Sequence, residues 1–282
     1  FVSGMTYTLG DVATSAITFA STSTTQQTVD FGGKTVGNIT FGTSGTPNYA
    51  IISAINTGST ATVTSTFGHL YLDGPSSNLG LSHAFGKFAA SASNVRTINL
   101  GTATYTLSGT SINWNMSTTN NITLVATSST IISLGSTGGQ TITFTTGNKS
   151  YGTVILQGAN EASIGVGNAS NANFINLTRN GSSDTASRNI IQLNLPANAT
   201  VTVTGSFTVT GESTIKRALV WPSSNGVPAT LVLTGASLSL QNVDFQDVIF
   251  NNGGSNLDLS TITGGSGDAG GNSMSGGGTL TF

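Results

Sequence analysis

The sequence contains no cysteine, so it has neither a disulfide framework nor a thiolate metal site. Proline is also scarce, with 5 residues in 282, and aromatic residues make up 7%. No apolar run approaches the roughly 18 residues of a membrane-spanning helix, so we expect no membrane span. The chain starts at Phe1, and no charged segment followed by an apolar one comes after it. We therefore expect a processed chain or one segment of a longer polypeptide.

Charge is equally scarce. Asp, Glu, Lys and Arg make up 6% of the residues, against roughly 25% in an ordinary soluble domain. The 8 basic and 10 acidic residues are spread thinly along the chain and give a net charge of −2. Binding to duplex nucleic acid depends on clustered Lys and Arg that neutralise phosphates. The sequence therefore predicts no nucleic-acid partner.

Glycine is abundant, with 37 residues, and long stretches are rich in Ser, Thr and Asn. Such a composition also occurs in disordered chains, but those combine low hydrophobicity with high net charge. Here 37% of residues are hydrophobic and charge is almost absent. We expect an ordered chain whose surface is made of hydroxyl and amide groups.

Apolar and polar residues alternate in short runs that end at Gly, Asn, Ser or Pro, which is typical of strands bounded by turns. The runs are ATYTLSG (103–109), QTITFTTG (140–147), ATVTVTGSFTVTG (199–211), ATLVLTGASLSLQNVDF (229–245) and GTLTF (278–282). In the third run, Val201 and Val203 share one face with Ala199, and the threonines share the other. No long segment keeps a helical period, so the pattern predicts an all-β protein.

Two segments resemble each other: TVDFGGKTVGNITF (28–41) and TITFTTGNKSYGTVIL (141–156). The first contains Gly33-Lys34-Thr35, the end of a phosphate-binding loop, but the glycine required five residues earlier is Thr28. We interpret both segments as a turn between two strands, with Lys34 and Lys149 at equivalent tips. The alternative is that the two lysines contact a shared anionic ligand.

A β-solenoid, parallel β-helix-like, suits this pattern, because neutral side chains can stack every ~4.8 Å where charged ones would repel. At roughly 20–25 residues per coil the chain would make about a dozen coils. We expect one elongated β-rich domain over 1–282, with a possible weak subdivision into 1–110 and 111–282. An array of antiparallel β-sandwiches and a fibre-like segment held by trimeric winding are the alternatives.

Two carboxylates lie close together in NVDFQDVIF (242–250), and paired carboxylates are what glycan cleavage needs. Val243 and Phe245 share one parity, whereas Val248 and Phe250 share the other, so the alternation slips between them. A bulge or corner there would turn Asp244 and Asp247 toward solvent. The structural interpretation is a corner capped by an Asp side chain. The functional one is a catalytic or metal-binding pair, with Asp258, Glu212 and Asp184 as distant partners.

Other residues are weaker candidates. GGSGDAGGNS (264–273) approaches a calcium-binding repeat, but Asp268 stands one position early, so a flexible glycine loop is the alternative. His69 and His83 are the only histidines, and no Ser/His/Asp arrangement accompanies them. The remaining candidates are aromatic residues and two basic neighbours, which either pack in the core or bind a saccharide. These are Tyr71, Trp114, Trp221, Lys216 and Arg217.

The phrases GGKTVGNITF, GNKSYGTVIL and SLQNVDFQDVIF, followed by GGSGDAGGNSM, resemble repeats in structural proteins of tailed-bacteriophage virions, especially tail-fibre and tail-spike proteins. The matching stretches cover about a third of the chain, and bacterial adhesins share the composition. The resemblance implies a virion component with a β-rich shaft, often a homotrimer, that faces the host. It carries over no catalytic residue.

The sequence thus favours a structural protein of the virion surface or the extracellular space, without a cofactor, that positions or performs recognition of host-surface glycans. Its partners would be copies of itself and other virion proteins. The alternatives are a glycan depolymerase that uses Asp244 and Asp247 on the same fold, and a bacterial surface adhesin.

Overall fold

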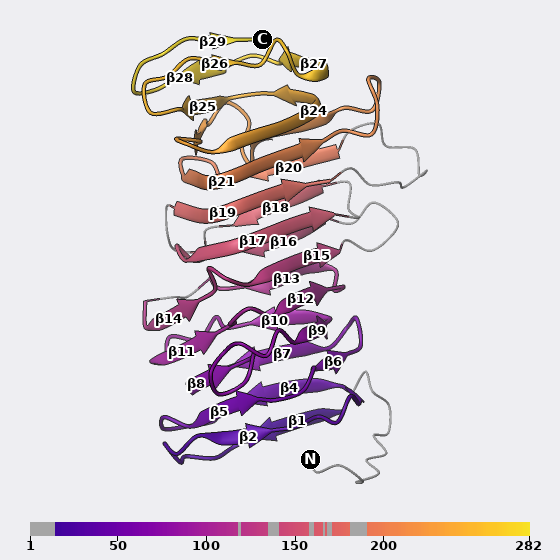
Figure 1. The fold of residues 1–282 in the computed structure, drawn as a ribbon, viewed down its shortest axis with the longest axis vertical. Coiled ribbons are helices and arrows are strands. Elements are labelled where there is room, and N and C mark those ends of the chain that lie inside the picture. Colours follow the sequence, from indigo (N-terminus) through magenta and orange to yellow (C-terminus); the bar gives the residue numbers. More distant parts are fainter. Residues whose placement is uncertain are drawn as a thin grey trace.

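The computed structural model describes residues 15–117, 120–134, 141–157, 161–165, 167, 171–180 and 191–282. In this part of the chain the secondary structure is β-strand, without a helix, and the strands stack into a β-solenoid of about ten turns (Figure 1). All pairings between the described strands are parallel, which confirms the solenoid and excludes the antiparallel sandwich. β1 (Ala16–Phe19) lies near one end of the stack and β29 (Leu280–Thr281) near the other.

The chain visits three faces in turn, and one pass over the three makes a coil. Face I contains β2 (Gln27–Val29), β5 (Asn48–Ile51), β8 (Gly68–Tyr71), β11 (Arg96–Asn99), β14 (Ile122–Val125), the first halves of β17 (Ser150–Gln157), β19 (Asn171–Arg179) and β21 (Thr200–Thr210), then β23 (Ala229–Val232), β25 (Val248–Asn251) and β28 (Ser273–Met274).

Face II contains β3 (Thr35–Val36), β6 (Asn56–Thr57), β9 (Ser82–Phe85), β12 (Thr104–Leu107), β15 (Thr130–Leu134), the second halves of β17, β19 and β21, and the first half of β24 (Ser237–Phe245).

Face III contains β1 (Ala16–Phe19), β4 (Asn38–Phe41), β7 (Thr62–Ser65), β10 (Lys87–Ala89), β13 (Ser111–Asn115), β16 (Thr141–Thr145), β18 (Glu161–Gly165), β20 (Ile191–Leu195), β22 (Ala218–Pro222), the second half of β24, and β27 (Thr263–Asp268). β26 (Leu257–Asp258) pairs with β29 (Leu280–Thr281) near the C-terminal end.

The coils are less uniform than expected. The coil that leads from Ala229 to its partner Val248 is much shorter than the coil that leads from Thr200 to its partner Thr230. The strands remain in register because the extra residues lie in corner loops. On each of the three faces, a strand that precedes residue 110 pairs with a strand that follows it. These pairs are β10 with β13, β11 with β14, and β12 with β15.

The apolar side of each strand faces inward, as the period of two predicts. Val201 and Val203 are fully buried, and the alternating threonines of β21 lie outside. On face III, one inward column runs through consecutive strands and continues the core from coil to coil. Its members are Ile39, Val63, Phe88, Trp114, Phe144 and Ile164.

Both lysine-containing turns are confirmed. The Lys34 amide donates to the Phe31 carbonyl over 3.0 Å, and the Lys149 amide donates to the Thr146 carbonyl over 3.3 Å. The two residues inside each turn have positive φ, from 59° to 71°, which glycine and asparagine tolerate.

The two lysines do not hold equivalent tips, so that prediction is wrong, and so is the alternative of a shared anionic ligand. The first turn joins face I to face II, between β2 and β3, whereas the second joins face III to face I, between β16 and β17. The Nζ of Lys149 donates to the Ile122 carbonyl over 2.7 Å, and its burial lowers its pKa. This lysine ties its turn to the coil before it.

Candidate functional site

Trp221 stands on the outer side of face III and is half-buried. Its strand β22 pairs with β20, which places Trp221 beside Asn194. The indole Nε1–H donates to the Oδ1 of Asn194 over 2.8 Å. Because this bond uses the only polar atom of the indole, the ring is held in one orientation against the sheet.

Asn194 links the tryptophan to a carboxylate. Its Nδ2 donates to the Oε1 of Glu161 over 2.7 Å, and its side chain is almost fully buried. Glu161 also accepts hydrogen bonds from the hydroxyls of Thr141 (3.1 Å) and Ser163 (3.4 Å). The resulting network extends from β16 to β22. We call these five residues, Trp221, Asn194, Glu161, Ser163 and Thr141, the Trp221 surface.

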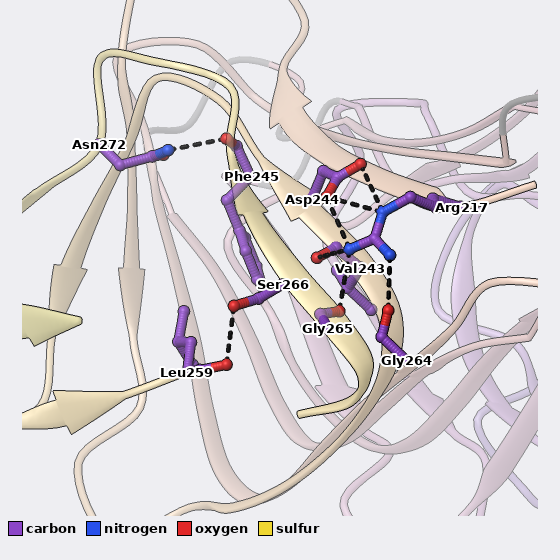
Figure 2. Close-up of polar contacts among 9 residues, drawn as sticks. All are labelled: Arg217, Val243, Asp244, Phe245, Leu259, Gly264, Gly265, Ser266 and Asn272. Atoms are coloured by element: carbon purple, nitrogen blue, oxygen red, sulfur yellow. Dashed lines mark hydrogen bonds and ion pairs between the residues drawn. The ribbon is translucent and has the colours of Figure 1, made fainter. Parts of the chain in front are cut away.

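The basic pair beside β22 is engaged within the fold. The Nε of Arg217 donates to both oxygens of Asp244 over 2.9 and 2.8 Å, and its Nη2 approaches Oδ1 to 2.8 Å. Its remaining donors reach the carbonyls of Val243 (3.2 Å), Gly264 (2.7 Å) and Gly265 (2.9 Å) (Figure 2). One side chain thus contacts β24 and β27 from the corner before β22, and we call this cluster the Arg217 clasp. Lys216 forms an exposed pair with Glu212 at 3.3 Å.

The slip in alternation between β24 and β25 is a corner, as the structural interpretation holds. Val243, Phe245, Val248 and Phe250 all point inward and are fully buried or nearly so, although their parity changes. Asp247 lies at the corner with a φ of 51°, in the left-handed region.

The side chains of the two candidate acids make structural contacts. Asp247 accepts the Gly226 amide over 3.0 Å and thereby caps the neighbouring loop. Asp244 lies on the outer side of β24, where the clasp holds it. Both are partly exposed, as expected, but their carboxylates already have partners.

Glu161, a further carboxylate on this face, lies too far from Asp244 to form a hydrolytic pair. Glu161 is in register with Gln192, Leu219 and Asp244 on three successive strands. Three strand spacings amount to about 14 Å. Glycosidase carboxylates lie about 5–9.5 Å apart.

The remaining acidic candidates form local turns. The Oδ1 of Asp268 accepts the Gly270 amide over 2.8 Å and Asn272 Nδ2 over 2.7 Å. Asp258 is fully exposed, and hydrogen bonds from Ser260 lower its pKa. In the described part of the chain no three His, Asp or Glu side chains gather in a way that could hold a metal ion. Asp184 lies outside the described residues.

Among the aromatic candidates, Trp114 is a correction. It is fully buried between Phe88 and Phe144, and its Nε1 donates to the Tyr151 hydroxyl over 3.1 Å, so it offers no surface to a saccharide. Tyr71 is half-buried on the outer side of face I, beside Asn99. Trp221 and Tyr71 therefore lie on different faces and form separate surfaces.

Several charged or titratable side chains are buried in ways that the sequence pattern did not indicate. Arg96 donates to four backbone carbonyls, and burial lowers its pKa to about 10. Arg179 at the end of β19 is likewise buried and bonded to carbonyls. His83 accepts the Ile55 amide at Nδ1 (3.0 Å) and contacts the Leu72 carbonyl through Nε2 (2.6 Å). These residues bond to the backbone of neighbouring loops and strands, and these contacts are structural.

The chain matches no protein-family model, no curated protein and no solved structure. Within the described residues there is also no helix of the length and apolarity that crossing a bilayer requires. The fold and the Trp221 surface are therefore the basis for assigning a function.

Proposed function

We propose that this chain is a structural protein of a virion surface, similar to a tail fibre or tail spike, that recognises host-surface glycan through the Trp221 surface. In this proposal the solenoid is a stiff shaft, it forms a homo-oligomer, a trimer in the simplest case, and it joins other virion proteins. The location is the virion surface or the extracellular space.

The observation that carries the proposal is the fixed, half-exposed indole of Trp221 beside polar groups. Ligand sites combine an apolar or aromatic surface with a few polar groups that fix orientation. A pyranose offers C–H groups that pack on an indole and hydroxyls that can pair with amide and carboxylate oxygens. The buried Asn194 fixes the indole and the Glu161 carboxylate through hydrogen bonds, so ordering these two groups on binding costs little conformational entropy.

The shape of the molecule supports the same proposal. A continuous parallel stack with buried side chains from end to end is suited to projecting a binding surface away from its attachment point. Several shafts on one particle would bind a repetitive glycan with high avidity, even if each contact is weak. The resemblance to tail-fibre repeats agrees with this role.

The depolymerase alternative uses the same fold but different residues. It needs a free carboxylate pair, whereas Asp244 is bonded to Arg217 and Asp247 caps a loop. The adhesin alternative shares the binding surface and differs only in what the shaft is attached to. We therefore favour recognition over cleavage.

The test is binding to capsule or lipopolysaccharide purified from candidate host strains, measured by biolayer interferometry with the immobilised polysaccharide. We expect the wild-type chain to bind and Trp221→Ala to lose at least tenfold in affinity. Tyr71→Ala is the matched control, because it removes another half-exposed aromatic side chain from face I and should bind like the wild type.

Three results would contradict the proposal. Wild-type protein that binds no host polysaccharide excludes recognition by this chain. Equal binding by wild type and Trp221→Ala excludes the Trp221 surface. Release of oligosaccharides that stops in Asp244→Asn or Asp247→Asn would establish the depolymerase instead.

A further inference from the structure

Face II carries a regular polar column on its outer side. From β9 to the first half of β24, outward residues are paired strand by strand in one line. The members are Ser82, Thr104, Thr130, Thr153, Asn176, Ser206 and Ser237. A second line runs beside it, two residues along each strand. Its members are Ala84, Thr106, Ile132, Ile155, Thr178, Thr208 and Ser239. Neither line contains a charged residue.

The middle of this face is apolar. Ile132 and Ile155 are paired on neighbouring strands, point outward and are only half-buried. Leu134 lies two residues beyond Ile132 on the same side of β15, and Ile175, at the edge where β19 turns from face I, is 38% exposed. Hydroxyl-bearing residues surround this group. An apolar centre with an uncharged polar rim is the anatomy of a protein interface.

The polar side chains around the apolar centre have a low desolvation cost. The Nδ2 of Asn176 donates to the Thr153 hydroxyl over 3.1 Å, and the Ser206 hydroxyl donates to the Oδ1 of Asn176 over 2.9 Å. Side chains that already bond to one another keep these partners when water is displaced, so the desolvation cost is reduced. Ser, Thr and Ala are also short, which keeps the face flat.

The charge distribution indicates which partner fits. Face III carries Lys87, Glu161, Asp244 and Asp268 on its strands, so charged groups would lose water where two copies met there. The outward residues of the described face II strands from β9 to β24 carry no charge, so they neither repel an identical face nor recognise a charged partner. It carries no tyrosine or tryptophan on its outer side either, unlike the Trp221 surface.

We propose that face II between β9 and β24 is the surface on which a second copy of this chain packs, with Ile132 and Ile155 at the centre of the contact. This contact rests on the self-association in the proposed function, but identical faces that pack on each other join two copies, so it predicts a dimeric contact in place of the trimer. Glycan recognition on face III does not depend on it, so the two can fail separately.

The area of face II determines how strongly two copies should associate. Seven strands at ~4.8 Å spacing and about five residues of ~3.3 Å each span about 29 by 16 Å, or roughly 500 Å² per copy. A standard stable interface uses about 800 Å² per partner. We therefore expect concentration-dependent association, strengthened where copies are held together on a particle.

The first experiment is light scattering coupled to size-exclusion chromatography over a concentration series. The wild-type mass should rise above 28.4 kDa as concentration increases. The double variant Ile132→Lys/Ile155→Lys should stay monomeric at every concentration. Val125→Lys/Val232→Lys, which places the same charges on the outer side of face I, should associate like the wild type. Circular dichroism and the melting temperature verify that all variants fold.

A second experiment avoids destabilising the fold. Because the chain has no cysteine, a single introduced cysteine reports only its own surroundings. Under mild oxidation, Ile155→Cys should form a covalent dimer much faster than Val125→Cys. A wild type that stays monomeric at every concentration would overturn the proposal. So would an oligomer that persists in Ile132→Lys/Ile155→Lys. Equal rates of disulfide formation in Ile155→Cys and Val125→Cys would also overturn it.

Discussion

Between β9 and β17, aromatic rings stack in the core from coil to coil, whereas beyond β22 the buried core is mainly aliphatic and polar contacts on the outside join the coils. In the first region the rings of Phe88 and Trp114 lie 4.5 Å apart and those of Trp114 and Phe144 lie 5.5 Å apart. His83 stacks on Tyr105 at 5.0 Å. In the second region, the Arg217 clasp joins β24 and β27 from the corner before β22.

The two regions also differ in coil length. The coil that leads from Gly68 to its partner Arg96 is longer than the coil that leads from Ala229 to its partner Val248. Coil length alone does not decide where rings stack, because the coil from Gln27 to its partner Tyr49 is also shorter than the coil from Gly68 to Arg96, yet its Phe41 stacks on Phe19. The core is also less covered beyond β22: Leu238 is in register with the buried Phe207, yet is 38% exposed. The comparison teaches that a continuous apolar core can be supplemented differently along one solenoid, by stacked rings between β9 and β17 and by outer polar contacts beyond β22.

The largest effect should come from Trp114→Ala. The substitution removes a ring that contacts three aromatic neighbours and leaves the Tyr151 hydroxyl without its donor. Large-to-small changes of this kind cost about 3–5 kcal/mol in the free energy of unfolding. Urea denaturation measures it, and Trp221→Ala serves as the control, with an expected loss of about 1 kcal/mol. Equal losses in the two variants would show that the inner stack contributes no special stability.

The next effect is a pH dependence that comes from His83 in the same region. Burial lowers the pKa of His83 from 6.5 to about 4, so the native state stays neutral where the unfolded chain takes up a proton. Stability is therefore complete above pH 6.5 and falls as the pH decreases toward 4. The total loss is about 3 kcal/mol, because each pKa unit corresponds to about 1.4 kcal/mol.

Urea denaturation between pH 7 and 4 measures this slope. His83→Gln should be less stable at pH 7 but should show a flatter profile through this range. The control is His69→Gln, which replaces the outward-facing histidine of β8 and should keep the pH dependence of the wild type. A wild-type slope in His83→Gln would assign the pH dependence to other groups.

Much of the fold is readable from the sequence, because period-two alternation and positive-φ turn residues are local signals. The strands around Val201, the turn at Lys34 and the corner at Asp247 follow from neighbours in the chain. The corner is the clearest case, since a change of parity in an apolar run marks the point where a strand leaves one face for the next.

The candidate site could not be read in the same way. Glu161, Asn194 and Trp221 come from three strands, and their contact depends on a register that varies with loop length. The two tryptophans also look alike in sequence. They differ because β13 has an irregular register between Ile112 and Trp114, so Asn113 and Trp114 are both buried. Only the neighbouring strand reveals such a shift.

The smallest of the three effects, and the most local, should come from Arg217→Ala. It removes the donors to Asp244 and to the Gly264 and Gly265 carbonyls, all of which lie near the surface. We expect a loss of about 1–2 kcal/mol, concentrated in the C-terminal coils. Hydrogen exchange should show faster exchange in β24 and β27 and none of this change in β9 to β17.

Two matched variants sharpen the result. Arg217→Lys keeps the charge but lacks the planar fork, so it should restore only part of the protection. Lys216→Ala removes the neighbouring exposed pair with Glu212 and should change stability by less than about 0.5 kcal/mol. If exchange in β27 is the same in Arg217→Ala and Lys216→Ala, the C-terminal coils do not depend on the clasp, and the contrast between the two regions must be attributed to the core alone.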